Sequence, residues 1–80
     1  MGMIDQVTGR SLYRMEVYNA SPFSAGSKIR IFGGVESNNP LIAGCTIKKI
    51  YPKSREIEVT APIPNEVKVG DYVIVGGING

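Results

Sequence analysis

The residues best suited to chemistry lie in one short stretch, "KKIYPKSR" at positions 48–55. Four basic residues surround one tyrosine in this stretch, namely Lys48, Lys49, Tyr51, Lys53 and Arg55. Basic side chains neutralise phosphates and an aromatic ring stacks on a base, which is how several β-barrel proteins hold single-stranded nucleic acid. The competing interpretation is a hairpin tip whose lysines and arginine maintain solubility and discourage edge-to-edge pairing. We favour the hairpin tip, because a single tyrosine offers a small stacking surface.

Catalytic and metal-binding chemistry has little support in the sequence. Histidine, the commonest general base and a frequent metal ligand, is absent from the 80 residues. The single cysteine, Cys45, cannot form an internal disulfide, and its apolar surroundings predict a small core residue. Glu56 and Glu58 could bind a cation, but their spacing is typical of a solvated strand face that pairs with Lys48 or Arg55. We therefore expect no enzyme, no metal ion and no cofactor.

The pattern of apolar residues predicts the elements that carry these side chains. Apolar and polar residues alternate at 13–17, 28–32 and 56–61, which is typical of strands with one buried face. Apolar runs at 41–51 and 71–75 predict two more strands. Turn residues separate these segments every ~8–12 residues, as in small β-barrels and sandwiches. The sequence predicts an all-β fold, a small antiparallel barrel or sandwich of five to six strands, and a closed barrel is favoured because free edges aggregate.

One phrase occurs twice in the chain. "FSAGSKIRIFG" at 23–33 and "VKVGDYVIVGG" at 67–77 align on Gly26 and Gly70, which are 44 positions apart. Glycine adopts the positive φ that a tight turn needs, and a following residue such as Asp71 bonds back to nearby backbone. We interpret Gly26, Gly70 and Asp71 as structural turn residues that send a strand into the barrel at a sharp angle. The alternative is a phosphate-binding glycine loop, but such loops precede a helix.

The order of these motifs resembles a small β-barrel module of tailed-bacteriophage structural proteins, in particular a module inserted in some major capsid proteins. The resemblance spans residues 23–77 and rests on the first glycine turn and strand, the hairpin "TIKKIYPKSREIEVT" and the final "VKVGDYVIV". It implies a non-catalytic phage or prophage virion protein, in the capsid or at the head–tail connection. Its partners would be other virion proteins or further copies of itself.

Composition and the chain ends give the remaining expectations. The net charge of +2 is too small by itself to imply a nucleic-acid or membrane partner. Residues 1–10 have few apolar side chains and predict a flexible N-terminal arm, which leaves residues 11–80 as a single β-barrel domain. The chain has no apolar run long enough for a secretion signal or a membrane span, so we expect the virion, or the bacterial cytoplasm during assembly.

Two functions follow from the sequence. The leading hypothesis is a virion structural and assembly module that acts through protein–protein contacts. The alternative is a nucleic-acid-binding β-barrel that uses the basic hairpin 48–55. The second is disfavoured because Glu56 and Glu58 follow the basic stretch directly and would repel a phosphate backbone.

Overall fold

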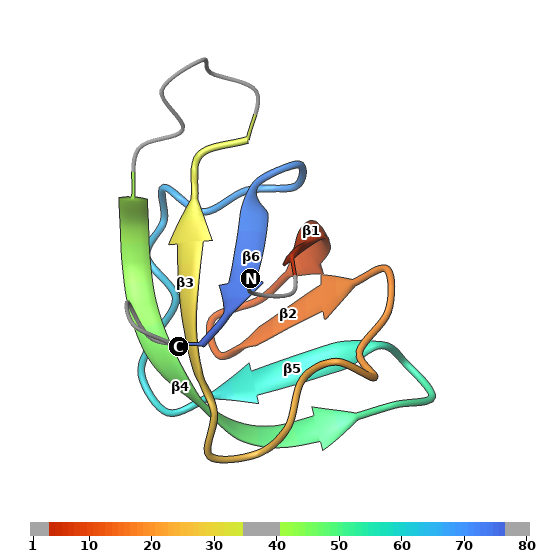
Figure 1. The fold of residues 1–80 in the computed structure, drawn as a ribbon. Helices are drawn as coiled ribbons and strands as arrows, with labels where there is room; N and C mark the ends of the chain where they lie inside the picture. The colour runs from red at the N-terminus through yellow and green to blue at the C-terminus, as the bar shows by residue number, and fades with distance from the viewer. Residues whose placement is uncertain (1–3, 35–40, 77–80) are drawn as a thin grey trace.

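Six β-strands make up the part of the chain that the computed structural model describes, residues 4–34 and 41–76 (Figure 1). The strands are β1 (Ile4–Arg10), β2 (Arg14–Val17), β3 (Lys28–Phe32), β4 (Leu41–Tyr51), β5 (Glu56–Val59) and β6 (Tyr72–Val75). No helix occurs within these two ranges. The prediction of an all-β fold with five to six antiparallel strands is confirmed.

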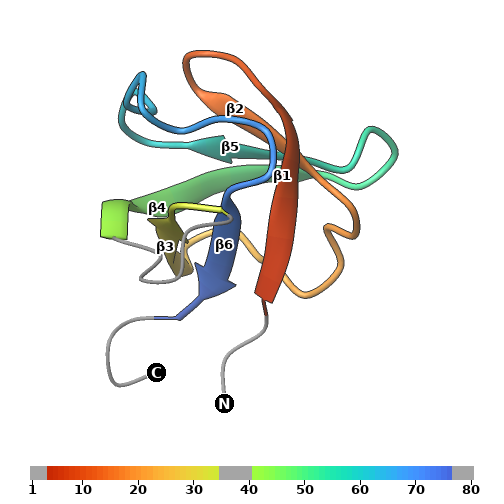
Figure 2. The ribbon, with the colours of Figure 1, turned by 90° about the horizontal axis from the view of Figure 1, so that it is seen from above.

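The strands form a closed barrel in the order β1–β2–β5–β4–β3–β6, in which each neighbouring pair is antiparallel. β4 pairs with β3 through its first half and with β5 through its second half, and β1 likewise pairs with β6 and then with β2. The register shifts after Val7 and after Ile47, where a bulge lets a strand bend. Figure 1 shows the curve of β4, and Figure 2 shows β1 running from β6 towards β2.

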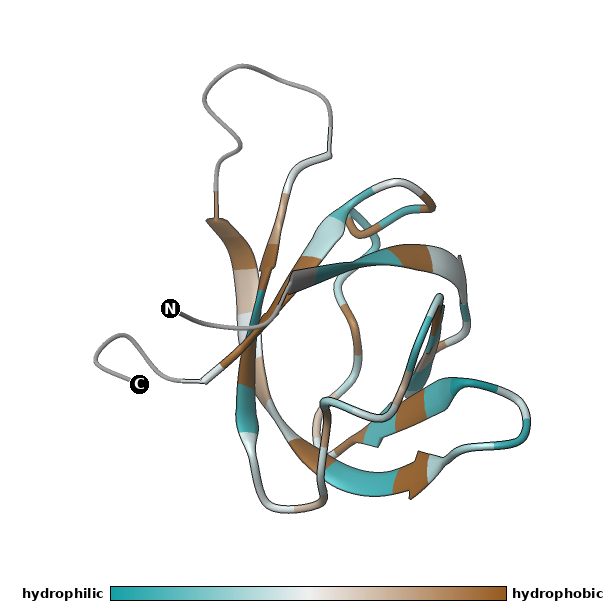
Figure 3. Cartoon of the chain, turned by 45° about the vertical axis from the view of Figure 1, so that its right-hand side comes forward, coloured by the Kyte–Doolittle hydropathy of each residue, from teal (hydrophilic) through white to brown (hydrophobic). Residues whose placement is uncertain are grey.

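The core fills the inside of this barrel with side chains from the inward faces of the strands. Apolar and polar residues alternate visibly along the hairpin of β4 and β5 (Figure 3). The turns between strands also contribute buried side chains, including Phe23, Ile63 and Val67. Among the described residues, the buried apolar side chains are those of Val7, Met15, Val17, Ala20, Phe23, Ile29, Ile31, Ile47, Ile57, Val59, Ile63, Val67 and Val73. Tyr13 belongs to the same alternating segment as Met15 and Val17, which predicts a buried side chain. In the structure Tyr13 precedes β2 and is 42% exposed, so it lies outside the core.

The prediction of a flexible arm over residues 1–10 is wrong for residues 4–10. These residues form β1, which closes the barrel and carries Val7 into the core at 1% exposure. The guanidinium of Arg10 donates hydrogen bonds to the backbone carbonyls of Ile63, Pro64 and Val67, and so ties β1 to the linker before β6. Residues 1–3 lie outside the described part of the chain. The domain boundary therefore moves back from residue 11 to include β1.

The second half of the barrel repeats the pairing pattern of the first half. β1 lies between β2 and β6, and β4 lies in the same way between β5 and β3. An internal twofold rotation would exchange Met15 with Ile57 and Arg30 with Ile74, and the members of each of these pairs lie opposite one another. The strands β1, β2 and β3 thus correspond in order to β4, β5 and β6.

The first copy of the repeated phrase connects the turn before β3 to the middle of β4. Gly26 has a φ of 89°. Its N–H donates to the carbonyl of Ile47 at 2.8 Å, and the N–H of Ile47 donates to the carbonyl of Ser27 at 2.8 Å. This pair of hydrogen bonds holds β4 at the residue where its register shifts.

The second copy makes the same connection between the turn before β6 and the middle of β1. Gly70 has a φ of 98°, its N–H donates to Val7, and the N–H of Val7 donates to Asp71, both at 2.8 Å between backbone atoms. The buried carboxylate of Asp71 also accepts from the backbone N–H groups of Lys68 at 2.9 Å and Gly34 at 3.0 Å. A Cβ on Gly34 would lie 2.4 Å from the carbonyl oxygen of Gly70, so the two segments approach too closely for a side chain there. The two phrases are therefore equivalent parts of the internal repeat.

We predict that Gly26→Val and Gly70→Val each destabilise the fold by about 1–3 kcal/mol, because a β-branched residue is strained at positive φ. Urea denaturation measures both losses. The matched control is Gly44→Val in β4, where no positive φ occurs and a Cβ would meet its nearest neighbour, the carbonyl oxygen of Ile29, at an ordinary 3.6 Å. Losses below about 0.5 kcal/mol in both turn variants would contradict the structural role of the turns.

Candidate functional site

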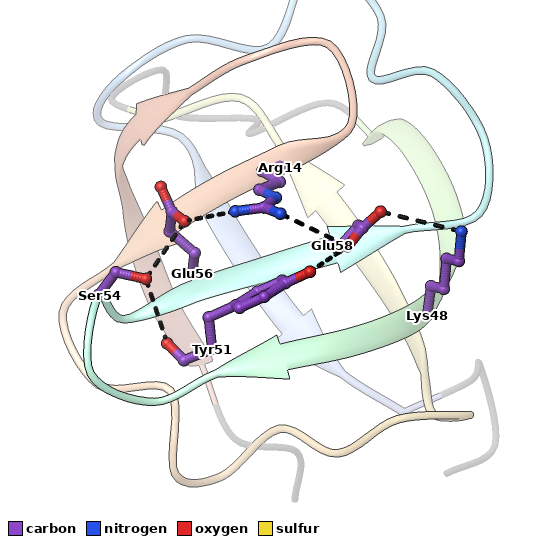
Figure 4. A network of polar contacts seen from close by, with 6 residues as sticks. All are labelled: Arg14, Lys48, Tyr51, Ser54, Glu56 and Glu58. Carbon is purple, nitrogen blue, oxygen red and sulfur yellow. Dashed lines mark hydrogen bonds and ion pairs between the residues drawn. The ribbon is translucent and has the colours of Figure 1, made fainter.

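Lys48 and Tyr51 of the hairpin lie on the outer face of the sheet formed by β4, β5 and β2, beside Arg14, Glu56 and Glu58 (Figure 4). Across β4 and β5, Tyr51 is opposite Glu56 and Lys49 is opposite Glu58. Across β5 and β2, Glu58 is opposite Arg14. Acidic residues of the central strand thus separate the basic residues of the two outer strands, which favours ion pairs within the sheet.

The two glutamates of β5 bind basic side chains from both neighbouring strands. Arg14 contacts Glu56 at 3.2 Å and Glu58 at 3.9 Å, measured between guanidinium nitrogen and carboxylate oxygen. Lys48 contacts the other oxygen of Glu58 at 3.9 Å. At the hairpin tip, Ser54 donates a hydrogen bond to Glu56 at 3.2 Å. Glu56 and Glu58 therefore neutralise the basic face, as the sequence predicted for Lys48, and Arg14 is an additional partner.

Tyr51 takes part in the same network through both its ring and its hydroxyl. The hydroxyl donates to Glu58 at 2.7 Å, and the guanidinium carbon of Arg14 lies 4.0 Å from the ring centroid. The ammonium of Lys49 lies 5.1 Å from the same centroid. Cations at these distances are attracted by the ring's π electrons. A base that stacked on Tyr51 would compete with these cations for the ring.

The remaining basic residues of the hairpin differ in their partners. Arg55 does not bind the glutamates of β5; its guanidinium contacts Glu16 of β2 at 3.7 Å. Arg55 also has a φ of 57°, in the left-handed region, at the end of the tight turn. Lys53 is exposed and makes no ion pair with the described residues. The residues predicted to contact nucleic acid thus lie on one hairpin. However, Lys48 and Arg55 form ion pairs with glutamates, and Lys49 lies beside the ring of Tyr51.

Arg14 is the member of this site that the sequence analysis missed. Its place in an alternating segment predicts a side chain on the outer face, and the structure has Arg14 half-buried there, with its side chain 42% exposed. Its partnership with Tyr51 depends on β2 lying next to β5, and β5 lying next to β4. Strand order of this kind involves pairing between distant segments, and no local pattern in the sequence specifies it.

The hydrogen bond between Tyr51 and Glu58 shifts the pKa of both groups. It raises the pKa of Tyr51 above its ordinary value of 10.0 and lowers the pKa of Glu58 below its ordinary value of 4.5. Lys48 and Arg14 also contribute to the lowered pKa of Glu58. The network therefore stabilises the fold fully between these two ordinary values, and this contribution is lost as the pH falls through the folded pKa of Glu58 or rises towards that of Tyr51.

Cys45 is half-buried beside the core, with its side chain packed against buried residues. Burial raises the pKa of its thiol, which lowers the fraction of reactive thiolate at neutral pH. In residues 4–34 and 41–76, histidine, cysteine, aspartate and glutamate side chains form no group of three that could hold a metal ion. The same residues contain no helix that could cross a membrane.

Comparisons with protein-family models, with curated proteins and with solved structures gave no match for this chain. The functional argument therefore depends on the residues and their geometry.

We predict that Glu58→Ala lowers the pKa of Tyr51 towards 10.0, because the hydrogen bond that favours the neutral phenol is removed. A pH titration of ¹³C-labelled tyrosine rings by NMR follows Tyr51 separately from the other tyrosines. The control is Glu66→Ala, which removes an exposed carboxylate from the linker before β6. A pKa of Tyr51 that changes equally in both variants, or in neither, would contradict the proposed bond.

Proposed function

We propose that this protein is a non-catalytic structural module of a phage or prophage virion, in the capsid or at the head–tail connection, and that it acts through protein–protein contacts. The observation that supports a role in protein–protein contacts is that the outer surface has two kinds of region, one polar and one with exposed apolar side chains. Polar side chains of the β2–β5–β4 face bind one another, whereas large apolar side chains elsewhere are exposed. These are Leu12 at 56%, Tyr13 at 42%, Tyr18 at 65%, Leu41 at 59% and Val69 at 64% exposure.

A small closed barrel suits an assembly role for physical reasons. Each of the six described strands has two neighbours in the ring, which limits uncontrolled strand pairing with neighbouring subunits. Contacts must then form through side chains on the outer faces and turns, where exposed aromatic and aliphatic residues contribute most binding energy. The virion itself enters the proposal through the motif resemblance over residues 23–77.

The alternative function, nucleic-acid binding through the hairpin 48–55, gains no support from the site geometry. Two of the four predicted phosphate-binding residues, Lys48 and Arg55, already contact carboxylates. Binding a phosphate backbone would place its charges beside Glu56 and Glu58, which repel them. The ring of Tyr51, the proposed stacking surface, lies 4.0 Å from the guanidinium carbon of Arg14.

The direct test is the composition of virus particles from a bacterium that carries the gene. After prophage induction, we expect mass spectrometry of purified particles to find this chain in a fixed ratio to the other virion proteins. A gene position beside portal, protease or tail genes would agree with this result. A chain that is abundant in the induced cells but absent from the particles would contradict the virion role.

A further inference from the structure

A hollow of about 480 Å³ lies on the outer face of the sheet formed by β3, β4 and β6, away from the glutamate network. Its lining residues are Lys28, Ile29, Arg30, Leu41, Gly44, Cys45, Thr46 and Gly76. We call this hollow the β3–β4 groove. Leu41, at its edge, is 59% exposed. The described lining contains two basic residues and no acidic residue.

Comparison of the two halves of the barrel shows that the fold does not require this groove. Gly44 pairs with Arg30, and Ile4 holds the equivalent position opposite Ile74 in the other half. An isoleucine therefore occurs in one half where the other half has glycine. A Cβ on Gly44 would meet its nearest neighbour at 3.6 Å, an ordinary contact, so neither backbone nor packing demands glycine there. Glycine inside a strand weakens it, and a close approach by another molecule is one reason for its presence.

The positive charge in the groove has no acidic partner among the described residues. Lys28 and Arg30 are two positions apart on β3, so both side chains point to the outer face. The Nε of Arg30 is buried and makes no hydrogen bond, and its guanidinium carbon lies 5.7 Å from the ring centroid of Phe32. No described carboxylate pairs with the guanidinium of Arg30, so an incoming carboxylate would bind its accessible N–H groups through charge-assisted hydrogen bonds. This arrangement contrasts with the β2–β5–β4 face, where the arginines have carboxylate partners.

We propose that the β3–β4 groove binds a carboxylate side chain, Asp or Glu, that lies between apolar residues in an extended segment of a partner protein. The carboxylate accepts hydrogen bonds from the guanidinium of Arg30 and lies beside the ammonium of Lys28, and an adjacent apolar side chain covers Leu41. The proposal deepens the protein-contact role proposed above and depends on it.

A protein segment fits the groove better than a nucleic acid does. A nucleic-acid strand carries a charge at every nucleotide and is held by a track of basic residues along its backbone. The groove offers Lys28 and Arg30 side by side, which match a single carboxylate. Its edge at Leu41 is apolar, which suits a neighbouring aliphatic side chain of the same segment.

The experiment follows the Nε–H signal of Arg30 by NMR in the folded, ¹⁵N-labelled chain. The probes are the blocked peptides acetyl-Leu-Glu-Leu-amide and acetyl-Leu-Gln-Leu-amide, together with a thymidine decanucleotide. We expect the glutamate peptide to shift the Arg30 signal saturably and to bind about tenfold more tightly than the glutamine peptide, the usual worth of a charge-assisted hydrogen bond.

Two variants locate the binding. Arg30→Gln should weaken binding of the glutamate peptide about tenfold, and Gly44→Leu should abolish it by filling the groove while Arg30 stays in place. The matched control is Lys53→Gln, which removes an exposed charge at the hairpin tip and should leave binding unchanged. Circular dichroism verifies that each variant remains folded.

Four outcomes would overturn the proposal. They are equal binding of both peptides, an unchanged affinity in Gly44→Leu, tighter binding of the decanucleotide, and a dimer of the chain that Gly44→Leu dissociates, since a second copy would then be the occupant. Peptide binding and the particle analysis fail independently. If the chain is found in particles but does not bind the peptides, only the proposal about the β3–β4 groove is contradicted. If the chain binds the peptides but is absent from particles, only the virion role is contradicted.

Discussion

The hydrogen bonds of Val7 with Gly70 and Asp71 are the constraint on which this barrel depends. They hold the bend of β1, so that one strand pairs with β6 at its start and with β2 at its end. Without this closure, β2 and β6 would each present a free edge, and the small core of an 80-residue chain would be open on one side. The buried carboxylate of Asp71 also accepts a hydrogen bond from the backbone N–H of Gly34, which connects the turn before β6 to the segment after β3.

The same constraint operates a second time at Ile47, where Gly26 and Ser27 hold the bend of β4. A barrel made of two equivalent halves frees its outer residues to differ, since the backbone pattern is maintained by the turns and the inward side chains. The outer faces do differ. One has its arginines and glutamates bound to each other, and the other has Arg30 and Lys28 beside a groove with no described acidic partner. These two faces are not related by the repeat. Within the repeat, Gly44 lies opposite Arg30 where Ile4 lies opposite Ile74, and we attribute that difference to the proposed groove, because the fold imposes the same pairing on both positions.

Local features were predictable from the sequence and non-local ones were not. The all-β class followed from alternation, and Gly26 and Gly70 could be placed in turns because positive φ is a local requirement. β1 was missed because Val7 is the one described residue of that strand that lies in the core, so the alternating pattern is too weak to detect. The pairing of Arg14 with the β4–β5 hairpin was missed because it depends on strand order. Local patterns specify which residues form strands and turns, and the pairing of distant strands is decided by the whole chain.

Native-state hydrogen exchange at the amide of Val7 tests the central claim most directly. If ring closure and the core form together, the amides of Val7 and Ile47 exchange only through global unfolding. Their exchange free energies should then equal each other and the unfolding free energy from urea denaturation. A Val7 amide that exchanges through a local opening, with a free energy well below that of Ile47, would show that β1 detaches while the rest of the barrel stays folded. That result would contradict the account in which the other five strands depend on closure by β1.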